Sequence, residues 1–367
     1  MTETARPVAT VDVQPLLDAQ DGVAAALIEI LGGDARFVGG SVRDLVIGQS
    51  GGDIDIATPL HPNNVVRRLT REGWKTVPIG IEHGTVLAVA PEGAGTFEVT
   101  TLREDVETDG RHATVRFTDS WQKDAARRDF TYNALSLDRN GYLYDYFGGL
   151  EDLEEGRTRF VGNATERIAE DRLRILRAYR FHARFGLRDW DAATAWALEA
   201  QAPGLLELSG ERVRQEIGKI IVGPKVLRTI RQMAQHSVLQ HALPPARHRF
   251  RMDDFSLLER LMILEDLHDE PGLWRRIAAL LHRDKERMVE LANRFKIANR
   301  DREALLRLAS DVPARTLNWS LYLDGQEAAL DRLLIDAADM NAPASAEHVR
   351  RILTFTPVTL PVTGQDA

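Results

Sequence analysis

The most informative part of the N-terminal sequence is Phe37-Val38-Gly39-Gly40-Ser41-Val42-Arg43-Asp44, followed closely by Asp53-Ile54-Asp55. It reads as a short apolar strand, a glycine turn and a helix, and then a strand with alternating carboxylates. Paired glycines let a backbone approach a bound group closely. Successive amide N–H groups and a helix N-terminus can bind an anion. The pattern predicts a phosphate-binding turn, and the alternative is an ordinary glycine turn.

The two aspartates carry the main chemical signal. Residues i and i+2 of a strand face the same side, so Asp53 and Asp55 are predicted on one face of a strand at 52–57. Carboxylate oxygens suit hard cations such as Mg²⁺, and a metal pair can activate an attacking hydroxyl. Alone, such a pair is more often two solvated acids, but the glycine turn upstream favours metal binding. Glu98 is a candidate third acid, and a structural strand residue is the alternative.

The order of the predicted elements indicates an α+β protein. Further strands are expected at 35–38, 85–90, 97–102, 131–137 and 142–144, and helices at 11–33, 42–47 and 62–72. Residues 103–118 lack periodicity and are predicted to form a loop. Later elements are all helical: 163–185, 192–201, 210–221, 225–236, 255–266, 274–296, 301–309 and 325–339. This predicts an α/β domain at 1–150, a helical neck at 151–243 and a helical body and tail at 244–367, with Pro244–Pro245 at the last boundary.

Composition narrows the class of protein. The 367 residues include no cysteine, which excludes disulfides and thiolate metal sites and favours a cytoplasmic protein. No run of ~18 apolar residues is present, so no membrane span is expected. The net charge of −8 is unusual for a nucleic-acid-binding protein. However, nine arginines lie between Arg157 and Arg188, and we expect them to form a local basic groove.

Two further motifs complete a recognisable series. They are Arg127-Arg128-Asp129-Phe130-Thr131-Tyr132-Asn133-Ala134 and Glu170-Asp171-Arg172-Leu173-Arg174-Ile175-Leu176-Arg177-Ala178-Tyr179-Arg180-Phe181. Together with the first two, in this order, they resemble the class II tRNA nucleotidyltransferases, a family shared with bacterial poly(A) polymerases. The resemblance runs from about Phe37 to Gly223. It implies a nucleotidyltransferase head of the polymerase-beta-like kind, followed by an all-helical neck, body and tail.

The resemblance also implies site residues. Asp53 and Asp55 would hold Mg²⁺ and act in catalysis with Glu98. Gly39, Gly40 and Arg43 would contact the triphosphate. The residues implied to contact the nucleotide are Arg128, Asp171, Arg174, Arg177 and Arg180. The tract Gly210–Arg214 resembles the last block near the head, although a capped helix explains it equally well.

Asp171 and Arg174 would explain base choice. At spacing i, i+3 they are predicted to be neighbours on one helix. A carboxylate accepts and a guanidinium donates hydrogen bonds, which matches the amino donor and ring-nitrogen acceptor that cytosine and adenine share. The alternative is a solvated salt bridge. Arg180 would lie roughly opposite Asp171, so phosphate binding, tRNA binding or packing is expected for it.

The segment 103–118 bears on the product. It resembles the loop of full CCA-adding members, especially the mitochondrial type, with Asp109, Gly110 and Arg111 at its centre and Gly110 as a hinge. We therefore expect addition of C, C and A to the tRNA 3′ end from CTP and ATP, with the loop needed for the change from C to A. The alternatives are a poly(A) polymerase or a partial CC- or A-adding enzyme. A non-catalytic RNA-binding module is disfavoured, because the carboxylates and glycines are present.

Basic residues of the body are candidate contacts to the RNA backbone, or else a solvated helix face. They are Arg247, His248, Arg249, Arg251, Arg275, Arg276, His282, Arg283, Lys285 and Arg287. The tripeptide His282-Arg283-Asp284 resembles a degenerate metal-phosphohydrolase motif. It lacks a complete ligand set, so no second hydrolytic site is expected.

Overall fold

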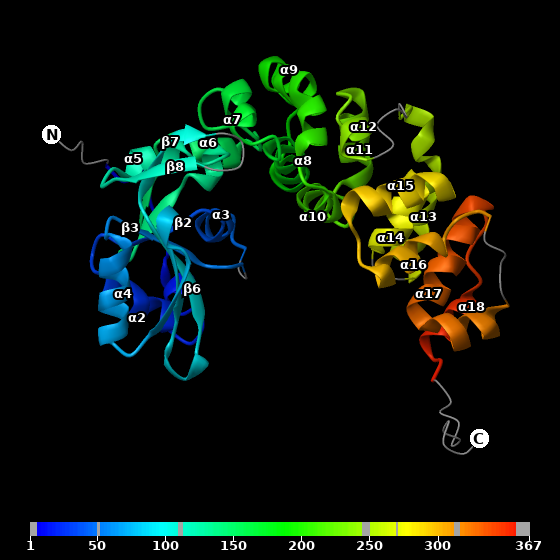
Figure 1. Cartoon of the computed structure of the whole chain (residues 1–367), viewed down its shortest axis with the longest axis horizontal. Helices are drawn as coiled ribbons and strands as arrows, with labels where there is room; N and C mark the ends of the chain where they lie inside the picture. Colours follow the sequence, from blue (N-terminus) through cyan, green and yellow to red (C-terminus); the bar gives the residue numbers. More distant parts are fainter. Residues whose placement is uncertain are drawn as a thin grey trace. The chain divides into compact units, whose positions relative to one another are not determined.

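The computed structural model describes residues 6–49, 52–108, 113–243, 250–268, 271–311 and 316–356. The chain divides into two compact units. The first unit is Met1–Arg174 with Phe185–Ala197, and the second is Ile175–Arg184 with Leu198–Ala367. Within the described ranges, all strands belong to the first unit and the second contains only helices (Figure 1). This confirms the predicted α+β class. No helix in these ranges is long and apolar enough to cross a membrane.

A mixed sheet of eight strands forms the centre of the first unit. Its order is β1 (Ala9–Thr10), β10 (Tyr142–Tyr144), β9 (Ser136–Asp138), β2 (Arg36–Val38), β3 (Asp55–Thr58), β6 (Thr96–Thr101), β5 (Thr85–Val89) and β4 (Lys75–Gly80). Strands β3 and β6 pair in parallel and place Asp55 opposite Glu98. The prediction missed β4, whose proline and glycine are typical of an edge strand.

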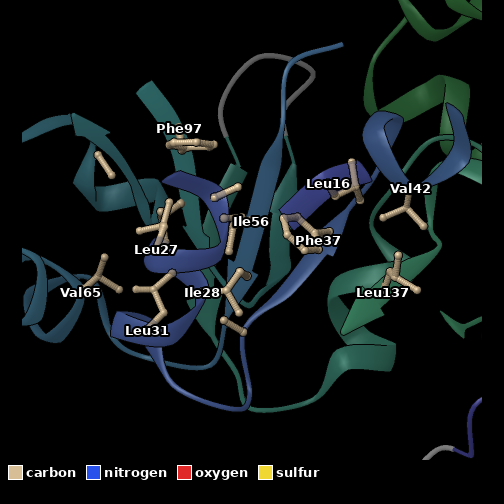
Figure 2. Close-up of a cluster of buried hydrophobic side chains, with 14 of the residues drawn as sticks. Leu16, Leu27, Ile28, Leu31, Phe37, Val42, Ile56, Val65, Phe97 and Leu137 are labelled. Carbon is tan, nitrogen blue, oxygen red and sulfur yellow. The ribbon is translucent and has the colours of Figure 1, made fainter. Parts of the chain in front are cut away.

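One face of this sheet carries the hydrophobic core. Helices α2 (Val23–Leu31) and α4 (Pro62–Arg71) supply Leu27, Ile28 and Val65, which pack with strand side chains (Figure 2). Burying each large apolar side chain stabilises the fold by about 1.5–3 kcal/mol. Because strand side chains alternate between faces, Ile56 enters the core and Asp55 faces the opposite side. The core thus occupies one face of the sheet and leaves the face that carries Asp55 available for a functional site.

Three predicted helices are each broken in two. Residues 11–33 form α1 (Gln14–Leu17) and α2, separated by the positive φ values of Gln20, Asp21 and Gly22. Residues 163–185 form α7 (Ala164–Glu170) and α8 (Arg174–Phe185). Residues 274–296 form α14 (Leu273–Leu280) and α15 (Lys285–Phe295), where the Asp284 carboxylate accepts from the Arg287 amide. Apolar periodicity continues across such breaks, whereas a capping side chain starts a new helix.

The prediction of a loop at 103–118 is wrong for the residues of this segment that the structure describes. Strands β7 (Arg103–Thr108) and β8 (Ala113–Phe117) form an antiparallel hairpin. The register shifts between Asp105 and Glu107, and such an irregularity hides the two-residue period in the sequence. Asp109, Gly110 and Arg111 lie outside the described residues.

The other helices of the first unit are α3 (Gly40–Val46), α5 (Trp121–Ala126) and α6 (Gly149–Glu154), and α9 (Ala192–Gln201) begins there. The second unit contains α10 (Gly210–Ile221), α11 (Val226–Gln235), α12 (Leu239–Ala242), α13 (Ser256–His268), α16 (Asn299–Leu306), α17 (Leu317–Asp339) and α18 (Ala346–Leu353), besides α14 and α15. A Cβ on Gly210 would lie 1.6 Å from the Arg294 carbonyl oxygen. Close packing of α10 on α15 therefore explains this glycine.

Arg275, Arg276 and Arg283 fit neither of the alternatives given for them, because all three are buried and their guanidinium groups are paired with acids. Arg275 and Arg276 are buried and donate to Glu265 at 2.6 and 2.5 Å. Arg283 is also buried and pairs with Asp336 and Asp339. Removing one partner of a buried pair typically costs 3–5 kcal/mol, so substituting Arg275 or Arg276 alone is expected to destabilise the helical unit. Lys285 is exposed and pairs with Asp311. Arg247, His248 and Arg249 lie outside the described residues.

Candidate active site

The carboxylates gather where β3 begins. Asp55 is the first residue of β3 and lies directly opposite Glu98 of β6. In-register residues of parallel neighbours point to the same face, so the two carboxylates share one side of the sheet. Asp53 precedes the strand and is exposed. The prediction that both aspartates lie within one strand is therefore wrong, but the three acids remain close enough to interact electrostatically.

The raised pKa of the Asp55 carboxyl is the main electrostatic feature of this site. Burial first, and then the charges of Glu98 and Asp53, raise the pKa of Asp55 to about 6, while Arg128 opposes the rise. Within the described ranges, no three acidic or histidine side chains already form a metal-binding group. Nevertheless, carboxylate oxygens that repel one another are the donors a hard dication prefers, because the cation neutralises them. The residues present fit a divalent metal.

At the glycine turn, the guanidinium group of Arg128 lies close to these carboxylates. Gly39 has φ 71° and ψ −128°, outside the regions that L-residues favour. A Cβ there would lie 3.1 Å from Arg128 Nη1 and 3.9 Å from Asp55 Oδ2. The Gly39 amide donates to the Leu135 carbonyl at 3.3 Å. That amide is used within the fold, so the expected anion-binding nest does not include it.

Gly39→Ala is expected to lower both stability and nucleotide binding. The positive φ costs about 1–3 kcal/mol for a residue with a Cβ, and the new methyl group would displace Arg128 from its place beside Asp55. Thermal unfolding measures the first effect, and the Kd for a nucleoside triphosphate measures the second. Gly48→Ala is the matched control, because Gly48 has the same φ of 71° and no neighbour within 4 Å of a Cβ. Equal Kd values for the two variants would contradict the proposed displacement of Arg128.

Arg43, predicted to contact the triphosphate, is buried in this structure. Its Nη1 donates to Asn133 Oδ1 at 2.5 Å, its Nε donates to Asp44, and its guanidinium lies over the Phe185 ring at 4.6 Å. Asn133 in turn donates to Asp129 at 2.9 Å. These bonds tie α3 to the motif that contains Arg128. Contact between Arg43 and a triphosphate stays a prediction, and the structural role of Asn133 was missed although the residue lies in the quoted motif.

The prediction that Asp171 and Arg174 are neighbours on one helix is wrong. Helix α7 ends at Glu170, and Asp171 is extended, with φ −151° and ψ 107°. Its Oδ1 accepts from the Leu173 amide at 3.0 Å, where α8 is about to begin. Arg174 donates to Glu170 at 2.5 Å and to the Arg127 carbonyl at 3.4 Å. Arg174 therefore contacts the Arg127–Arg128 motif. The role of Asp171 and Arg174 in base choice stays a prediction.

Arg177 and Arg180 belong to the second unit. Arg180 donates to Glu216 of α10 at 2.7 Å and lies over the Phe181 ring, 4.2 Å from its centroid. The wider arginine-rich tract is also largely paired. Its carboxylate partners are Glu151, Asp152, Glu155, Glu170 and Glu216. The expected basic groove is therefore wrong for most of these arginines. Acids of the same segment neutralise Arg157, Arg159, Arg167 and Arg174, and acids farther away along the chain neutralise Arg180 and Arg188.

Comparison with known proteins shows that these motifs lie within segments that match two protein families. Residues 35–159 match the family of the poly A polymerase head domain. Residues 190–248 match a family described as the probable RNA and SrmB-binding site of polymerase A. The first match contains the glycine turn, all three candidate acids and Arg128.

Relatives and solved structures agree with the family matches. The CCA tRNA nucleotidyltransferase 1, mitochondrial, of Homo sapiens is 47% identical over 53% of this chain and 45% of its own length. The chain thus spans about half the length of that relative and of its mouse counterpart. A CCA-adding enzyme of Leuconostoc mesenteroides is 32% identical over 98% of this chain and 85% of its own length.

A crystal structure of the Bacillus stearothermophilus CCA-adding enzyme in complex with CTP superimposes with a TM-score of 0.74 at 31% identity, covering 96% of this chain and 86% of that one. A CCA-adding enzyme in an apo form gives 0.68 at 26% identity, covering 95% and 88%. Similarity on this scale extends over both units of the chain. These matches show that the chain belongs to the family that contains the poly(A) polymerases and the CCA-adding enzymes.

Proposed function

We propose that this protein adds C, C and A to the 3′ end of tRNA, using CTP and ATP and releasing pyrophosphate. The observation that carries the proposal is the placement of Asp55 beside Glu98 and close to the Gly39 turn and Arg128. The names of the relatives, and the CTP complex of a similar structure, support this choice of substrates. A cytoplasmic location, which the cysteine-free sequence favours, is part of the proposal.

Asp53 and Asp55 would hold Mg²⁺, with Glu98 as a third acid beside them. The metal would supply charge neutralisation at the reacting phosphate and would favour ionisation of the tRNA 3′ hydroxyl. Arg128 and the glycine turn would bind and orient the triphosphate for in-line attack. Arg43 and Gly40 would support that turn from α3.

Base choice is proposed for Asp171 and Arg174, with Arg177 and Arg180 as further contacts to nucleotide or RNA. An acceptor beside a donor satisfies cytosine and adenine and leaves uracil and guanine with unpaired groups, which costs about 1–3 kcal/mol each. We assign catalysis to residues 1–150, nucleotide selection to 151–243 and tRNA binding to 244–367.

The decisive test supplies purified protein with a tRNA that ends at the discriminator base, Mg²⁺, and CTP, ATP or both. Products three nucleotides longer, ending in CCA, are expected only with both nucleotides, and a sequencing gel measures them. Growth with ATP alone would indicate a poly(A) polymerase, and products that stop after CC would indicate a partial enzyme. No growth would indicate an RNA-binding module. The Asp55→Asn protein, purified identically, excludes a contaminating host enzyme.

A further inference from the structure

Asp124, on the short helix α5, is a buried carboxylate that the proposed chemistry does not use. Its side chain is about 3% exposed. Oδ1 accepts from Arg127 Nε at 2.9 Å, and Oδ2 accepts from Arg128 Nη2 at 3.2 Å. One carboxylate therefore holds both arginines of the Arg127–Arg128 pair.

The same carboxylate also contacts the hairpin. Asp124 Oδ1 accepts from the backbone amide of Arg103, the first residue of β7, at 3.3 Å. A second, more exposed contact is the salt bridge between Lys123 of α5 and Glu104 of β7, at 2.9 Å. Helix α5 thus connects the base of the hairpin to Arg128, whose other amino group lies against Gly39.

Charge balance explains why Asp124 can be buried. Burial alone would raise its pKa, but the charges of Arg127 and Arg128 and the Arg103 amide hold the pKa below its ordinary value. The side chain is therefore ionised at neutral pH. A buried anion is tolerated only when it is paired and hydrogen-bonded, so Asp124 and its three partners stabilise one mutual arrangement. Loss of the charge would release Arg128 in particular, because among the described residues its one other hydrogen bond is a long one, 3.4 Å to the Asn133 carbonyl.

We propose that Asp124 is the positioning residue that fixes Arg128 at the nucleotide site and joins it to the base of the β7–β8 hairpin. The inference rests on the proposed function, since it assigns Arg128 to the nucleotide. Asp124 itself touches no substrate and acts only through its partners. Arg128 adjoins the acids and the glycine turn rather than Asp171, so the contact it makes is common to CTP and ATP.

Asp124→Asn is expected to raise the KM for CTP and for ATP by the same factor, about tenfold, and to change kcat much less, because a binding contact is lost. The preference for CTP over UTP should not change. Asp119→Asn, an exposed acid two residues before the helix, is the matched control and should leave both KM values unchanged. Equal effects of the two variants would overturn the proposal.

A double-mutant cycle separates positioning from general structural damage. In an Arg128→Ala protein, adding Asp124→Asn should change KM by less than about twofold, because the residue it positions is gone. An undiminished tenfold effect would show that Asp124 does not act through Arg128. If Asp124→Asn does not fold, Asp124→Glu is measured in the same cycle, with the same criterion.

Hydrogen exchange tests the link to the hairpin without any activity measurement. Asp124→Asn should speed exchange at the Arg103 amide, and Asp119→Asn should not. Unchanged exchange in Asp124→Asn would refute the link. The wild-type tRNA assay keeps the two hypotheses apart. A wild-type protein that adds no C or A contradicts the proposed function, whereas an active protein with an additive cycle contradicts only the positioning role.

Discussion

Asp55→Asn is expected to reduce nucleotide addition by on the order of 10³-fold or more, the size of loss that follows removal of a principal catalytic group. The amide keeps the shape of the side chain but removes the charge that would hold the metal. Both C and A addition should be lost, because Asp55 adjoins Glu98 and not the residues proposed to read the base. Single-turnover assays on tRNAs lacking CCA and lacking only A measure the loss.

The same substitution should stabilise the metal-free protein at neutral pH. The pKa of Asp55 is about 6 in the folded protein against 3.8 ordinarily, so folding favours the protonated form. The ionised carboxylate therefore destabilises the fold above pH 6, and this penalty disappears as the pH falls from about 6 to about 4. It is at most about 3 kcal/mol, and less where water reaches Asp55.

Thermal unfolding in EDTA at pH 7.5 and at pH 4.5 tests this prediction. Asp55→Asn should melt above the wild type at pH 7.5 and close to it at pH 4.5. Asp119 is exposed and is not among the charges that shift the pKa of Asp55, so Asp119→Asn provides the matched loss of a surface charge. An active Asp55→Asn protein would contradict the catalytic assignment, and a lower melting temperature at pH 7.5 would contradict the electrostatic one.

Local sequence predicted much of the head but not its long-range pairing. Gly39–Gly40 and Asp55 are close in sequence. Their proximity in space therefore follows from the local succession of a strand, a turn, a helix and the next strand. Glu98 reaches Asp55 only because β3 and β6 pair in parallel across a connection that contains α4, β4 and β5. No periodicity in the sequence encodes that register, so the residue was only a candidate. The role of Asp124 could not be predicted from the sequence, because its contact with the Arg103 amide forms only when α5 packs against β7.

The helical unit illustrates a different reason for error. Arg275 and Arg276 follow each other, and charged neighbours on a helix usually reach water. Glu265 and Asp331 lie 10 or more residues away in sequence yet surround the two guanidinium groups. Sequence reveals the charges but not which acids are brought to them. The same argument applies to Arg180 in the arginine-rich tract, which Glu216 neutralises from another helix.

Asp171→Ala is expected to weaken the preference for CTP over UTP by about 5–150-fold, the equivalent of 1–3 kcal/mol for one lost or unpaired hydrogen bond. The physical reason is complementarity. An ionised carboxylate accepts from the amino group of cytosine and repels the carbonyl of uracil. The measurement is the ratio of kcat/KM for the two nucleotides on a tRNA lacking CCA.

The Asp171→Ala substitution also has a structural effect, so it needs a control. Asp171 accepts from the Leu173 amide at 3.0 Å, so alanine also removes a bond at the start of α8, which typically costs about 1 kcal/mol. Asn163→Ala removes the equivalent cap of α7, where Asn163 accepts from Thr165 and Glu166. Both variants should lose similar stability, and only Asp171→Ala should change the nucleotide ratio. An unchanged ratio in Asp171→Ala would mean that this carboxylate serves the start of α8 alone. Base choice would then have to depend on Arg174 and Glu170, which already hold each other at 2.5 Å.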